Sequence, residues 1–164
     1  MGLLQSNGRG RRAFRRDALS PDAPIIVVHS LAHAVAALEA AAADDRDIVL
    51  LSAADAGIYA GAGWWKALLE AAGAAVPAAR FSAILDCGDQ AGAVQAALRA
   101  GIPAVIFTGR TDVAERLAAI AGRQRAQLLI TRPNAALDLA PLFFADGDVL
   151  RRRCADLLGA RTGG

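Results

Sequence analysis

Short, unbroken runs of apolar residues alternate with longer segments of helical periodicity from residue 25 onward, and this alternation restricts the fold more than any other feature. The apolar runs cover residues 25–28, 48–51, 81–85, 104–107 and 127–130. They are continuous instead of alternating with polar residues, which is typical of parallel strands covered on both faces. Short links between such strands require right-handed crossovers through a helix. We therefore predict an α/β domain with a parallel sheet of five strands.

The segments between the runs carry apolar residues at the three- and four-residue spacing of a helix. These positions mark helices near residues 31–38, 64–71, 94–98 and 113–120, and a last helix is predicted over about 146–158. Two architectures accommodate such a βα repeat. We favour a three-layer open sheet with flavodoxin-like strand order. The alternative is half of a (β/α)8 barrel, whose curved apolar interior would need a partner.

The chain has 164 residues, of which 55% are apolar, and this length fits one domain. Its basic surplus is local, because five arginines and only two acids stand in residues 1–22. The formal net charge is +2 for the whole chain, and it is −1 once residues 1–22 are removed. We expect residues 1–22 to form a flexible basic arm and residues 23–164 to form a single domain. Nucleic acid is not an expected partner except through the arm.

Cys87 and Cys154 are the two cysteines, and they stand sixty-seven positions apart. This spacing matches neither a zinc motif nor a redox pair, so we expect two free thiols in a reducing cytoplasm. No run reaches eighteen uninterrupted apolar residues, and no membrane span is expected. The sequence contains neither a Walker loop nor G-x-G-x-x-G, and it indicates no metal site and no organic cofactor.

Three candidate catalytic residues follow the predicted strands, at the edge where open parallel sheets bind their ligands. His29 suits acid–base chemistry because the pKa of an unperturbed histidine is near 6.5. Asp86 offers a carboxylate, and Cys87 stands near a helix start, which favours a thiolate. The structural alternatives are a half-buried His29 bonded to the backbone and an Asp86 that forms a strand-end hydrogen bond.

Hydroxyl, carboxylate, glycine and arginine residues at the same strand ends form a candidate ligand-binding set. They are Ser30, Ser52, Asp55, Gly88, Asp89, Thr108, Gly109, Arg110 and Arg132. Free N–H groups at helix starts bind anions, and arginine adds bidentate contacts, so the predicted ligand is a small anion. Asp89 also fits the N-cap position of the third helix, which is its structural alternative.

Trp64 and Trp65 are adjacent, and they are the only tryptophans of the chain. Neighbouring side chains on a helix point about 100° apart, so one ring can pack in the core while the other faces outward. The glycine-containing segment 53–63 precedes them, and long irregular segments of α/β domains are usually functional or lie at an interface. We therefore predict a homo-oligomer in which the two tryptophans lie at the interface.

Two segments resemble the fourth and fifth strands of response-regulator receiver domains: residues 106–109 (IFTG) and 129–133 (LITRP). The resemblance implies a phosphoacceptor aspartate after the third strand, and Asp86 holds that place. The chain departs from the receiver pattern elsewhere. His29 and Ser30 stand where receivers carry an acidic pair, and Arg132 stands in place of the lysine of the fifth strand.

Residues 97–105 (ALRAGIPAV) resemble a unit of aldolase-type barrels of the keto-deoxy-phosphogluconate aldolase class. The Schiff-base lysine of that class has no counterpart, because the single lysine, Lys66, lies in a predicted helix. Residues 59–65 (YAGAGWW) followed by 85–89 (LDCGD) resemble small bacterial α/β proteins that carry no assigned function. This last resemblance spans most of the domain and implies a fold without an activity.

Two functions fit these observations. The first is a self-associating α/β module that acts in interactions or binds a small anionic ligand at the carboxyl ends of the strands. Few residue types suited to catalysis are present: two histidines, one lysine and one tyrosine. The second is a small lyase- or hydrolase-like enzyme that acts on a small, phosphorylated or unphosphorylated metabolite through the edge residues.

Overall fold

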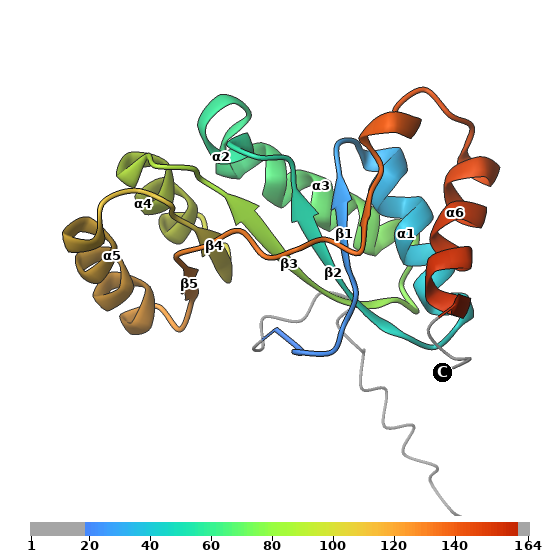
Figure 1. Cartoon of the computed structure of the whole chain (residues 1–164), viewed down its shortest axis with the longest axis horizontal. Coiled ribbons are helices and arrows are strands. Elements are labelled where there is room, and N and C mark those ends of the chain that lie inside the picture. Colours follow the sequence, from blue (N-terminus) through green and yellow to red (C-terminus); the bar gives the residue numbers. More distant parts are fainter. Residues whose placement is uncertain (1–18, 161–164) are drawn as a thin grey trace, which may run out of the picture.

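The structure, a computed structural model, describes residues 19–160 (Figure 1). The basic cluster of the predicted arm, in residues 1–18, lies outside the described residues. The described strands are β1 (Ile25–Val28), β2 (Asp47–Ser52), β3 (Arg80–Asp86), β4 (Ala104–Ile106), β5 (Gln127–Leu129) and β6 (Leu137–Asp138). The helices are α1 (Leu31–Ala43), α2 (Ala56–Tyr59), α3 (Gly61–Ala75), α4 (Ala91–Arg99), α5 (Thr111–Arg123), the short 3-10 helix η1 (Ala140–Leu142) and α6 (Gly147–Ala160).

The sheet is open and all its pairings are parallel, which confirms the α/β class and the parallel sheet. The five predicted runs each form a strand, with ends that differ from the prediction by at most one residue. Register places Val28 of β1 opposite Ser52 of β2, and Asp86 of β3 opposite Ile106 of β4. The strands therefore end at one carboxyl edge, as expected.

The strand count and order differ from the prediction. Within residues 19–160 the sheet has six strands in the order β5-β4-β3-β2-β1-β6, so the expected five-stranded, flavodoxin-like order 2-1-3-4-5 is not observed. Consecutive strands from β1 to β5 lie next to one another, which is also the strand order within a (β/α) barrel. The missed strand, β6, has only two residues, too few for a recognisable apolar run.

Right-handed crossovers that always step in the same direction place their helices on one face of the sheet, so the expected third layer is absent from the described residues. The main core joins that face to the helices: Leu38 of α1, Leu98 of α4 and Leu117 of α5 pack in the same cluster as Leu50 of β2. Side chains that point to the opposite face form a second cluster, which contains strand residues and no residue of the described helices.

The opposite face is crossed by residues 130–136, here called the strap, which leads from β5 back to the outer side of β1 (Figure 1). Leu19 and Ala23 pack against the same cluster, so the packed region extends to residue 19. After the strap, β6 pairs with β1, and α6 then packs against α1 through buried side chains that include Leu150 and Cys154. None of the helices in residues 19–160 is both long and apolar enough for a membrane crossing.

Candidate functional site

Asp86 is the last residue of β3 and is almost completely buried. Its Oδ1 accepts hydrogen bonds from the backbone N–H groups of Gly88 (2.8 Å) and Asp55 (3.3 Å). Its Oδ2 accepts from Nη1 of Arg132 at 2.5 Å. Both carboxylate oxygens are therefore occupied by donors of the chain itself. This arrangement matches the strand-end alternative, in which the carboxylate serves the fold.

Ser52, the last residue of β2, is fully buried beside Asp86. Its Oγ accepts from the backbone N–H of Asp86 (2.9 Å) and donates to the carbonyl of Ala53 (3.0 Å). Its carbonyl oxygen accepts from Nη2 of Arg132 (2.8 Å). Arg132 thus holds the strap to β2 and β3 at once. The structure brings Ser52, Asp86 and Arg132 together at the carboxyl edge, where they form a hydrogen-bonded network within the chain.

Gly88 and Asp55 meet above this network. Gly88 has φ +53°, and a Cβ placed on it would lie 2.2 Å from Oδ1 of Asp55. Asp55 itself adopts a left-handed conformation with φ +59°. The turn after β3 therefore favours glycine at position 88, because L side chains rarely adopt this backbone angle and a Cβ would displace the Asp55 carboxylate. The glycine serves local packing.

Cys87 is completely buried. Burial, together with the neighbouring charge of Asp86, raises the pKa of the Cys87 thiol to about 12. A thiol with this pKa stays protonated at neutral pH, whereas nucleophilic cysteines need a lowered pKa. The structure therefore contradicts the predicted thiolate character of Cys87. It does confirm that Cys87 and Cys154 are free thiols.

The remaining anion-site candidates are also used in local contacts. Arg110 forms a bidentate pair with Asp112, with both N–O distances at 3.0 Å. The carboxylate of Asp89 accepts from Nε2 of Gln90 (2.7 Å), and the N-cap of α4 is Gln90, so the predicted capping role of Asp89 is wrong. The side chains of Asp89 and Arg110 are exposed.

Thr108 and Gly109 shape the end of β4. The backbone N–H of Thr108 donates to the carbonyl of Gly88 (2.8 Å), which joins the ends of β3 and β4. A Cβ on Gly109 would lie 2.4 Å from the ring of Phe107. Gly109 is therefore required so that the chain can pass close to an aromatic side chain of the core.

His29 follows β1 and contacts β6. Its Nε2 lies 2.7 Å from Oδ1 of Asp138, which also accepts from the backbone N–H of Ala140 (2.9 Å). Burial raises the pKa of Asp138, but the hydrogen bonds from Ala140 and His29 outweigh it, and the net shift is downward. A histidine oriented by a carboxylate is an arrangement that suits acid–base chemistry.

His33, one turn into α1, is buried behind His29. Its Nδ1 accepts from the backbone N–H of His29 (3.2 Å), which places the ring proton on Nε2, and its ring packs edge-on against Phe143. Within residues 19–160 Nε2 has no hydrogen-bond partner of normal geometry. Burial and the nearby His29 lower the pKa of His33, against the opposing effects of the Leu142 backbone and Asp138. Its backbone N–H donates to Oγ of Ser30 (3.2 Å), so Ser30 caps α1.

Asp138 was missed by sequence analysis because β6 gives no periodic signal. The spacing of His29 and His33 was visible, but it did not reveal that one ring would be exposed in part and the other buried. Within the described part of the chain, no group of three or more histidine, cysteine or acidic residues could hold a metal ion.

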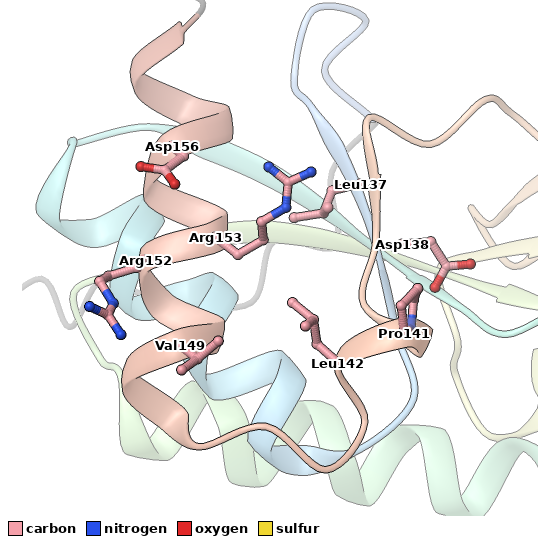
Figure 2. A pocket seen from close by; sticks show the side chains of 8 residues that line it. All are labelled: Leu137, Asp138, Pro141, Leu142, Val149, Arg152, Arg153 and Asp156. Carbon is pink, nitrogen blue, oxygen red and sulfur yellow. The ribbon is translucent and has the colours of Figure 1, made fainter.

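A pocket of about 500 Å³ lies between α6 and the segment that contains β6 and η1 (Figure 2). Its lining residues are Leu137, Asp138, Pro141, Leu142, Val149, Arg152, Arg153 and Asp156. Leu137, Leu142 and Val149 supply an apolar surface. Figure 2 shows Arg153 reaching from α6 toward Leu137, whereas Asp138 points away from α6. The pocket is therefore separate from the Ser52–Asp86–Arg132 network.

The two tryptophans differ as the helical geometry predicts. Trp65 is completely buried in the main core, while Trp64, in the first turn of α3, is 37% exposed. Trp65 therefore cannot lie at an interface, which corrects that part of the prediction. Segment 53–63, expected to be irregular, contains the short helix α2 and the start of α3.

The fold and these contacts define an α/β domain with an open, all-parallel sheet. No protein-family model matches the chain, and no curated protein matches its sequence.

Proposed function

We propose that this chain is a self-associating α/β interaction module that contacts a second copy through the carboxyl edge of its sheet. One observation carries the proposal. The polar residues of this edge are largely engaged in contacts within the chain, whereas large apolar side chains of the same edge face solvent. Clusters of exposed apolar side chains in a protein mark sites of interaction, and most of those at this edge follow the neighbouring strands β2, β1 and β6.

Exposed large apolar residues follow the carboxyl ends of β1, β2, β5 and β6. They are Leu31, Ile58, Tyr59, Trp64, Ile130, Phe143 and Phe144. The exposed fraction reaches 68% for Tyr59 and 96% for Phe144. Aromatic side chains are enriched in protein interfaces because they bury a large area at a small cost in conformational entropy. This distribution favours a protein partner over a small polar substrate.

A second copy is the partner that the charges favour. Residues 23–164 have a formal net charge of −1, so two such domains repel each other only weakly. A two-fold interface would bring the same surface of both copies together, which suits a surface that is apolar and not charged. We further propose a cytoplasmic setting, in which both thiols stay reduced.

Sedimentation equilibrium tests the proposal. The wild-type chain should associate reversibly as its concentration rises, and the double variant Tyr59→Ser/Trp64→Ser should remain monomeric. Ala74→Ser, on the exposed last turn of α3, is the matched control and should associate like the wild type. A wild-type chain that stays monomeric at every concentration measured would contradict self-association.

Tryptophan fluorescence gives a second readout. Trp65 is buried already, so association should shift only the emission of Trp64 to shorter wavelength. Trp64→Phe should abolish this concentration-dependent shift. An unchanged Trp64 emission in a proven dimer would place the interface elsewhere.

A small anionic ligand at the strand ends is the weaker part of the proposal, because Arg110 and Arg132 are paired with Asp112 and Asp86. A second candidate function, a small lyase- or hydrolase-like enzyme, is favoured by the 2.7 Å contact between His29 and Asp138. Hydrolysis of p-nitrophenyl acetate tests it. Turnover that exceeds the buffer rate and is lost in His29→Gln would support the enzyme hypothesis. Equal rates for the wild type and His29→Gln would exclude it.

A further inference from the structure

The pocket between α6 and β6–η1 combines an apolar surface with a single directed cation. Leu137, Leu142 and Val149 form the apolar part, and the side chain of Arg153 extends across it (Figure 2). The volume of about 500 Å³ lies within the range of about 300–1,000 Å³ that small-molecule sites occupy. Four of the eight lining residues are apolar and four are charged, so the pocket offers an apolar surface together with charged groups that can orient a ligand.

Arg153 has no ion-pair partner within residues 19–160. Its neighbour Arg151 shows the contrast, because it pairs with both Glu39 and Asp148. Of the other charged lining residues, Asp138 points away from α6 and accepts from His29 (Figure 2). Arg152 also lines the pocket and has no ion pair among residues 19–160, but its side chain points away from β6. Arg153 is therefore the guanidinium directed at the apolar surface, with Asp156 one helical turn further along α6.

We infer that this pocket binds a small organic monocarboxylate, with its carboxylate on Arg153 and its apolar body against Leu137, Leu142 and Val149. A guanidinium matches the two oxygens of a carboxylate with two parallel N–H donors. The apolar body follows from the three aliphatic side chains, which a fully polar anion would leave uncovered.

The charges favour a single negative charge over a phosphate dianion. One guanidinium can neutralise a carboxylate, whereas a phosphate would need further donors. The site is distinct from the strand-end anion site of the sequence analysis, because it uses none of those residues.

Saturation-transfer NMR with the full chain tests this inference, with hexanoate and phenylacetate as probes. Both should bind, while acetate, which lacks the apolar body, and hexanamide, which lacks the charge, should give no signal. Arg153→Gln should weaken the binding of hexanoate by at least about tenfold, as expected for the loss of a charge-assisted pair. Hexanamide that binds as well as hexanoate would overturn the inference.

Two further variants separate the site from general effects. Arg116→Gln removes an exposed arginine of α5 that also has no ion pair in the described residues, and it should bind hexanoate like the wild type. Val149→Asp places a negative charge on the apolar surface at a position 38% exposed, and it should abolish binding while the circular dichroism spectrum of the folded chain is kept. Equal affinity of Arg153→Gln and the wild type, or equal weakening by Arg116→Gln, would refute the site.

Discussion

Arg132 of the strap donates through Nη1 to Oδ2 of Asp86, at 2.5 Å, and so ties the strap to the carboxyl end of β3. The Asp86 side chain is 5% exposed, while that of Arg132 is 29% exposed. Removing one partner of a buried pair leaves an uncompensated charge in a poorly solvated place. This pair is therefore a structural element of the fold, and it can be tested as such.

Arg132→Met should lower the free energy of unfolding by about 3 kcal/mol, because the Asp86 carboxylate and the Ser52 carbonyl would each lose a donor in a poorly solvated place. Urea denaturation measures the loss. Arg110→Met, which breaks the exposed pair with Asp112, is the control and should cost less than about 1 kcal/mol. Equal losses of unfolding free energy in the two variants would show that the buried pair stabilises the fold no more than the exposed pair does.

Gly88→Ala should destabilise the chain by about 1–2 kcal/mol, because it forces an alanine into a left-handed conformation. Gly92→Ala is the matched change at an open helical position, where nothing lies within 4 Å of the new Cβ. It should stabilise by about 0.5–1 kcal/mol, since alanine loses less backbone entropy than glycine on folding. A tolerated Gly88→Ala would contradict the described turn.

We expect the free energy of unfolding to decline in mild acid because of His33. Its pKa is lowered in the folded chain, so the unfolded chain binds the proton first as the pH falls. The contribution of His33 to the free energy of unfolding is complete above pH 6.5, the ordinary pKa of histidine. It is lost progressively as the pH falls from 6.5 toward the lower pKa that His33 has in the folded chain. Thermal unfolding between about pH 5 and 8 should show this slope, above the range in which Asp138 is protonated.

His33→Asn provides the comparison for this slope. Its side-chain oxygen can still accept from the His29 amide, but it does not titrate. The decline below pH 6.5 should therefore be smaller in the variant than in the wild type. The same slope in both chains would assign the effect to another group.

The two cysteines should not react in the folded state. Burial raises the pKa of Cys87 to about 12 and that of Cys154 to about 11, although Arg153 opposes the second shift. At pH 8 a disulfide reagent that releases a coloured thiol should label neither residue rapidly. It should label both in urea. Rapid release of one equivalent from the native chain would contradict the described burial.

The sequence predicted the parallel strands well because their signal is local. The run 81–85 is continuous and apolar, and it lies within β3. The strand order was not predictable in the same way, because the order depends on which edge of the sheet the chain extends at each crossover. β6 was missed because its two residues are held by pairing to β1 and not by their own propensity.

The sequence predicted where the candidate site residues lie, but it did not predict what their side chains contact. Residues such as Ser52, Asp86 and Arg132 do meet at the carboxyl edge, because parallel strands share that edge. Their roles depended on pairwise distances that no pattern contains. Arg132 could have faced a ligand, but the crossing of the strap brings it to Asp86 instead.

The late return of the chain to β1 bears on how the protein folds during synthesis. Residues 25–129 can form five paired strands as they leave the ribosome, but β1 keeps one row of backbone N–H and C=O groups without a partner. Only after residue 138 has emerged can β6 pair with that row, and only then can α6 pack on α1. A nascent chain stalled before this point would present a free strand edge and an uncovered helix, which are the surfaces that chaperones and neighbouring nascent chains recognise.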